Sequence, residues 1–211
     1  MLYLQSFVCN PFSENSYILY NENKNAYIID PGNFTQNETD SISNFINKNE
    51  LQVKGILLTH AHIDHVLGLQ WAYNKYDCPV LLHPLEKEIL DRNPMTAQQF
   101  GFKFSAFSGE IIFVDENKTL ILDDDELKVY FVPGHSPGSI AFHCEKQNFV
   151  ISGDVLFQGS IGRTDLYKGN HEQLLESIRT QLFVLNDETE VFSGHGNSTT
   201  IGFEKLHNPF F

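Results

Sequence analysis

Short apolar runs alternate with amphipathic segments along the whole chain. Apolar residues at helical spacing predict one helix around Ile42, Phe45 and Ile46, a second from residue 66 to about 76, and a third that begins after Asn170. The apolar runs have the length and the β-branched content of strands. We expect strands at residues 2–8, 16–20, 26–30, 53–58, 79–83, 111–114, 119–122, 127–132, 139–144, 148–152 and 189–192.

This order of elements predicts an α/β protein. Two β-rich halves, each followed by helices, favour two sheets with helices outside them. No linker or low-complexity segment interrupts the 211 residues, so we expect a single domain over 1–211.

A dense group of polar side chains follows the expected strand 53–58. His60, His62, Asp64 and His65 lie within six residues, in the stretch Thr-His-Ala-His-Ile-Asp-His. Alternate residues of an extended segment point to one side, so His60 and His62 can bind one ion, while Asp64 and His65 lie where a helix begins. A polar surface loop seldom has this composition by chance. The motif therefore predicts a metal site.

Three further candidate ligands lie beside glycine at the ends of apolar runs. They are His135 in Pro-Gly-His, Asp154 in Ser-Gly-Asp and His195 in Ser-Gly-His. Taken singly, a histidine or aspartate in a turn is at least as often a hydrogen-bonded structural residue as a ligand. Together with the first group, they give the order H-x-H-x-D-H, H, D, H.

That order resembles the metallo-β-lactamase superfamily across nearly the whole chain. The resemblance implies a four-layer αβ/βα sandwich, and it implies two divalent ions, with zinc favoured and iron or manganese as alternatives. The first ion would be held by His60, His62 and His135, and Asp154 would bridge the two. The second would be held by Asp64, His65 and His195. These nitrogen and oxygen ligands suit all three metals.

Three segments outside the ligands are similar to the small bacterial glyoxalase II-like hydrolases. They are residues 10–17, residues 159–165, and the terminal pieces 194–196 and 208–210. Within the second, Arg163 and Asp165 are candidates to contact substrate, although a buried ion pair that braces the metal loop is favoured. Full-length glyoxalase II carries a helical domain that binds glutathione, and this chain ends at Phe211. We therefore expect weak selectivity for glutathione.

The resemblance implies hydrolysis of an acyl thiol, such as an S-2-hydroxyacyl glutathione, to a hydroxy acid and a thiol. Asp64 and Asp154 would help to hold a metal-bound hydroxide that attacks the carbonyl. The main alternative is a persulfide dioxygenase with a single iron on His60, His135 and Asp154. Hydrolysis of an acyl lactone and non-catalytic metal binding are further alternatives.

The resemblance implies a small-molecule substrate, and composition argues against nucleic-acid and membrane partners. The net charge is −13, with 27 acidic and 14 basic residues, which argues against nucleic acid as a ligand. No apolar stretch is long enough to span a membrane, and the first residues have no basic leader. Three scattered cysteines predict buried thiols and a cytoplasmic location. The oligomeric state is not predicted.

Two other features receive weaker predictions. Asp30, which follows a strand, is expected either to accept a ring N–H from a ligand histidine or to cap a turn. Residues 94–108 contain four phenylalanines with little regular periodicity. We expect them to form either a mobile wall of the substrate pocket or an insertion into the core. His83, His143, His171 and His207 match no ligand position.

Overall fold

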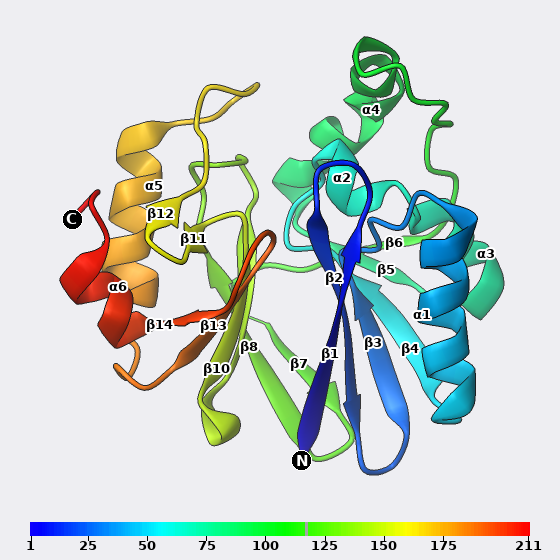
Figure 1. Ribbon diagram of the computed structural model, residues 1–211, viewed down its shortest axis with the longest axis horizontal. Helices are drawn as coiled ribbons and strands as arrows, with labels where there is room; N and C mark the ends of the chain where they lie inside the picture. The colour runs from blue at the N-terminus through cyan, green and yellow to red at the C-terminus, as the bar shows by residue number, and fades with distance from the viewer. Residues whose placement is uncertain (117) are drawn as a thin grey trace. The chain divides into compact units, whose positions relative to one another are not determined.

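The computed structural model describes residues 1–116 and 118–211. The chain forms two compact units, Met1–Val114 and Asp115–Phe211. Each unit contains one six-stranded sheet and its own helices, which can be followed by colour in Figure 1. The predicted α/β class is confirmed.

The first unit contains a sheet whose strands lie in chain order. It runs β1 (Leu2–Cys9), β2 (Glu14–Asn21), β3 (Asn25–Ile29), β4 (Gln52–Leu57), β5 (Val80–Leu82) and β6 (Ile111–Phe113). The first three strands form an antiparallel meander, and β4, β5 and β6 continue the sheet in parallel to β3. Parallel neighbours need crossover connections, and helices supply them. These are α1 (Gln36–Lys48), then α2 (Ile63–Val66) with α3 (Leu69–Tyr76), then η1 (Pro84–Glu86) with α4 (Lys87–Gln99).

Apolar faces of these helices pack on the sheet. Ile42 and Ile46 of α1 and Leu69 of α3 join one buried cluster with Ile28 and Ile56 of the central strands. Burying several such side chains, at about 2 kcal/mol each, stabilises this unit. It also fixes the end of β4, from which the first candidate ligands emerge.

The second unit contains a mixed sheet in the order β14-β13-β10-β9-β8-β7. Its strands are β7 (Thr119–Leu122), β8 (Asp125–Phe131), β9 (Ile140–Cys144), β10 (Phe149–Gly153), β13 (Glu190–Ser193) and β14 (Thr199–Thr200). The pair β10–β13 is parallel and the other pairs are antiparallel. A single turn, η2 (Glu145–Gln147), joins β9 to β10, and a small hairpin of β11 (Leu156–Phe157) and β12 (Ser160–Ile161) follows β10.

Helices at the end of the chain cover this second sheet. They are α5 (His171–Ser177), which continues as the π-helical turn η3 (Ile178–Leu182), and α6 (Ile201–His207). Leu174, Ile178 and Ile201 join a buried cluster with Val150 and Val191 of the sheet. The predicted N-cap of the third helix is confirmed, because Asn170 Oδ1 accepts the Gln173 N–H at 3.1 Å.

Two helical segments differ from the expectation. The sequence pattern predicts no helix in residues 87–99, yet α4 extends through Pro94 to Gln99. Ile89, Leu90, Asn93 and Ala97 form a buried stripe at helical spacing, and packing of this stripe outweighs the cost of the proline.

The helix expected at 66–76 is present as α3, which begins at Leu69, and the separate short helix α2 ends at Val66. The chain breaks at Gly68, where a Cβ atom would lie 2.0 Å from Asn33 Oδ1. Among the described residues, none of the helices combines the length and the apolar content needed to cross a membrane.

Candidate metal centre

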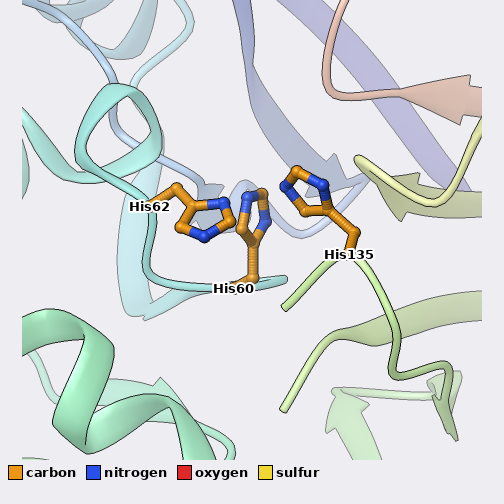
Figure 2. Close-up of side chains that lie close together, drawn as sticks. All are labelled: His60, His62 and His135. Atoms are coloured by element: carbon orange, nitrogen blue, oxygen red, sulfur yellow. The ribbon is translucent and has the colours of Figure 1, made fainter. Parts of the chain in front are cut away.

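Four of the predicted ligands lie on the loop that leads from β4 into α2. His60 and His62 precede α2, whereas Asp64 and His65 lie in its only turn. The rings of His60 and His62 are perpendicular, with centroids 4.8 Å apart, and Figure 2 shows both on this loop. Asp64 Oδ2 lies 3.8 Å from His65 Nε2. The first unit therefore presents two adjacent pairs of candidate ligand side chains.

Asp30 orients two of these histidines through a buried chain of hydrogen bonds. Its carboxylate accepts the Thr59 N–H at 2.8 Å and the Thr59 hydroxyl at 2.6 Å, and it lies 3.1 Å from His65 Nδ1. The Thr59 hydroxyl lies 3.1 Å from His60 Nδ1 and, since its own proton goes to Asp30, it accepts from that ring. The network thus places protons on both Nδ1 atoms, leaving both Nε2 atoms to bind a metal. Of the two predicted roles for Asp30, the structure supports that of holding ligand histidines.

Further side chains support the same loop, and the sequence reasoning did not assign them this role. The Asn10 amide donates to the backbone oxygens of Gly32 and Asp64, at 3.0 and 2.9 Å. Glu86 and Asn93 bind the backbone of Ala61. Burial raises the pKa of the nearby Glu14 carboxyl well above its ordinary value. In the sequence, the position of Asn93 among apolar residues at helical spacing is the one feature that could have indicated this role.

The second unit places its three predicted ligands after three strands of one sheet. His135 follows β8, Asp154 follows β10 and His195 follows β13. Because β10 and β13 are parallel neighbours, their carboxyl ends meet at one edge, where the Gly194 N–H donates to the Gly153 oxygen at 2.9 Å. Asp154 Oδ2 lies 3.6 Å from His135 Nε2 and 3.4 Å from His195 Nε2. One carboxylate oxygen therefore faces both imidazoles.

The ring of His135 is oriented by the backbone. Its Nδ1 lies 2.7 Å from the Arg163 carbonyl oxygen, to which it donates, so Nε2 faces Asp154 without a proton. Figure 2 shows this ring on the loop after β8. Gly162 permits the contact, because a Cβ atom there would lie 1.9 Å from the Asp154 carbonyl oxygen. The segment after β12 thus supports the His135 ring.

The expected buried ion pair of Arg163 and Asp165 is wrong in its burial. The two side chains form a bidentate pair with both distances at 2.7 Å, but they are 63% and 68% exposed. The hydrogen bond from Arg163 lowers the pKa of Asp165 to about 2. This segment therefore holds the metal loop through its backbone, because the paired side chains lie in solvent. Contact with substrate remains a prediction for both residues.

Cysteine and the other buried histidines take structural positions. Cys9, Cys78 and Cys144 are buried free thiols, as expected, and burial raises the pKa of Cys9 to about 12 and that of Cys78 to about 11. His83 Nδ1 accepts the Leu85 N–H at the start of η1. His143 lies on β9, where burial lowers its pKa. The cytoplasmic location remains a prediction.

The phenylalanines that follow α4 divide into two groups. The ring of Phe102 lies 5.7 Å from that of Phe12 and 5.0 Å from that of Phe34, within a partly exposed aromatic group that includes Phe100. Phe104 packs instead against the buried cluster of the first unit. Core packing is thus supported for Phe104, and the pocket wall stays a prediction for Phe102.

We expect Phe104→Ala to lower the free energy of unfolding by about 2 kcal/mol, because it removes a side chain packed on the core. Phe102→Ala should lower the melting temperature less and reduce turnover of acyl thiols more, if Phe102 forms a wall of the pocket. Thermal unfolding and steady-state kinetics of both variants check this. Unchanged turnover in Phe102→Ala would end the pocket-wall assignment.

The donor atoms suit a divalent metal ion. Imidazole nitrogens and carboxylate oxygens without thiolate are compatible with zinc, iron and manganese, so the donors do not determine which metal binds. All seven candidate ligand side chains are buried or half-buried, and hydrogen bonds with neighbouring groups orient the rings of His60, His65 and His135. That preorganisation is typical of a metal site and is rare in a polar surface loop.

Comparisons with known proteins agree with this arrangement. The sequence profile of the metallo-β-lactamase superfamily matches residues 9–195. The hydroxyacylglutathione hydrolase GloC of Haemophilus influenzae is 39% identical over 94% of this chain and 93% of its own length. The BLEG-1 B3 metallo-β-lactamase, known from its crystal structure, is 36% identical in sequence. The two structures match with a TM-score of 0.89 over 99% of each chain.

Two further structures bear on the metal and on the fold. The protein TTHA1623, solved in a di-iron-bound form, is 33% identical with a TM-score of 0.89, over 98% of this chain and 100% of its own. ETHE1 from Myxococcus xanthus has a TM-score of 0.79 over 98% of this chain and 83% of its own, and its 24% identity shows a shared fold alone. From the profile match, the 39% identity to a relative of equal span and the two sets of metal-type ligands, the chain belongs to the metallo-β-lactamase superfamily.

Proposed function

We propose that this protein is a metal-dependent hydrolase of acyl thiols, with S-2-hydroxyacyl glutathiones and related thioesters as substrates. The observation that carries the proposal is the Asp154 carboxylate, one oxygen of which faces the Nε2 atoms of His135 and His195. The 39% identity to a hydroxyacylglutathione hydrolase supports the choice of substrate.

The proposal includes a dinuclear centre within one functional domain over residues 1–211. His60, His62 and His135 would hold the first ion, whereas Asp64, His65 and His195 would hold the second, with Asp154 between them. Likeness to solved structures of the superfamily over 98–99% of this chain supports this combination.

The side chains of the protein would hold the metal ions and orient a bound water. A bound divalent ion lowers the pKa of a coordinated water from about 15.7 to about 7, and so supplies a nucleophile at neutral pH. Asp64 and Asp154 would accept hydrogen bonds from that water and orient it towards the thioester carbonyl. A thiol has a pKa of about 8.5, so the leaving group departs as a thiolate without a general acid. The exposed Arg163 side chain is our candidate to contact the acyl thiol.

One relative and the sequence motifs each favour a specific alternative. BLEG-1 carries the name of a β-lactamase, so ring opening of a β-lactam is a second candidate reaction. Persulfide dioxygenation remains the alternative that the sequence motifs suggest, with one iron on His60, His135 and Asp154. All three reactions can be assayed with one metal-reconstituted preparation.

We expect release of thiol from S-lactoylglutathione under anaerobic conditions, without consumption of oxygen. The same preparation should be tested with a persulfide, for oxygen uptake and sulfite, and with a chromogenic β-lactam. Oxygen uptake with the persulfide and no thioester cleavage under zinc, iron or manganese loading would overturn the proposal. β-Lactam turnover without thiol release would replace it with the second candidate reaction.

A further inference from the structure

Ala61 lies between the candidate ligands His60 and His62, and side chains from another element hold both of its backbone polar groups. Glu86 Oε2 accepts the Ala61 N–H at 2.7 Å. Asn93 Nδ2 donates to the Ala61 carbonyl oxygen at 2.9 Å. Glu86 and Ala61 are fully buried, and Asn93 is 2% exposed.

A single segment supplies both contacts. Glu86 is the last residue of η1, directly before α4, and Asn93 belongs to the buried stripe of α4 two turns further on. Packing of Ile89, Leu90 and Ala97 fixes this stripe, so the Asn93 amide is held against the loop. A buried carboxylate that accepts a backbone N–H makes a charge-assisted hydrogen bond, which is stronger than a neutral one.

The position of these contacts gives them a consequence for the metal site. The two peptide groups of Ala61 determine the directions in which the side chains of His60 and His62 leave the backbone. Rotation of either peptide group would change the directions of the two imidazoles, and the contacts of Glu86 and Asn93 oppose both rotations. The loop offers no regular strand pairing at this point, since β4 ends at Leu57.

We propose that Glu86 and Asn93 are positioning residues for the first metal ion, acting through the backbone of Ala61 on the spacing of His60 and His62. The inference rests on the metal site of the proposed function. It does not depend on which substrate is hydrolysed.

Glu204 offers a matched control in the second unit. It is also fully buried and also accepts a backbone N–H, that of Gly159 at 3.0 Å, together with the Thr199 hydroxyl at 2.5 Å. The Glu204 carboxylate accepts hydrogen bonds from Gly159, Thr199 and Asn208, which all lie outside the loop 59–65. Removing it should therefore destabilise the protein without affecting His60 and His62.

The experiment uses Glu86→Ala, Glu86→Gln and Glu204→Ala in the full chain, loaded with zinc or cobalt. The readouts are the melting temperature without metal, the affinity of each ion by competition with a chromophoric chelator, and the visible spectrum of bound cobalt. Glu86→Ala should lower the affinity for one of the two ions by about 10- to 100-fold and change the spectrum of bound cobalt. Glu86→Gln should restore both, because its amide oxygen still accepts the Ala61 N–H. Glu204→Ala should lower the melting temperature alone.

Wild-type affinities and an unchanged cobalt spectrum in Glu86→Ala would overturn the proposal, whatever the loss of melting temperature. Equal loss of affinity in Glu86→Gln and Glu86→Ala would also overturn it, because the hydrogen bond would then not be the cause. If Glu86→Ala does not fold, Asn93→Ala takes its place, with the same expected loss of affinity for one ion. A failure of thioester hydrolysis in the wild type would leave these metal readouts unaffected, so the two proposals can fail separately.

Discussion

Replacing His60 by alanine should reduce thiol release from S-lactoylglutathione by at least about 100-fold, the size of effect seen when one group that stabilises developing charge is removed. His60 is buried, and its ring is oriented by the Thr59 hydroxyl, which in turn donates to Asp30. Steady-state kinetics under anaerobic conditions measure the effect.

The matched control for this variant is His143→Ala. His143 is another buried histidine, and it lies on β9 rather than on a ligand loop. Its removal should lower the melting temperature and leave turnover within a few-fold of the wild type. Comparable losses of turnover in both variants would show that a general loss of stability, and not the loss of a ligand, is responsible.

Replacing Asp154 by alanine should remove more metal than any other single ligand substitution. One oxygen of Asp154 faces His135 and His195, which we assign to different ions, so its loss should lower the occupancy of both. His195→Ala should mainly empty the second position. Elemental analysis after dialysis is therefore expected to find less than one ion per chain in the first variant and about one in the second. Equal and minor losses from both would contradict the bridging assignment.

Most strands could be predicted because each is a short apolar run between turn residues. The sequence predicts that the strand before the ligand loop ends at Leu58, and β4 ends one residue earlier, at Leu57. The helix α4 was missed because Pro94 and the phenylalanines after it hide a buried stripe that is apparent only once it packs. Short elements such as β14 and α6 carry too few residues for a periodic pattern.

The candidate ligands could be identified because the chemistry of a metal site restricts residue type and spacing. The residues that hold those ligands could not be identified in the same way. Glu86 and Asn93 contact Ala61 across 25 and 32 residues, and no local pattern encodes such a pairing. The burial of Arg163 was misjudged because a sequence shows that two charges can pair but not whether solvent reaches them.

The most direct test of a dinuclear centre is anomalous diffraction from crystals of the metal-reconstituted protein, recorded at the absorption edge of the bound metal. We expect two peaks in each chain, one bounded by His60, His62 and His135 and the other by Asp64, His65 and His195, with the Asp154 carboxylate between them. A single peak in crystals grown with excess metal, or peaks bounded by other residues, would contradict the account.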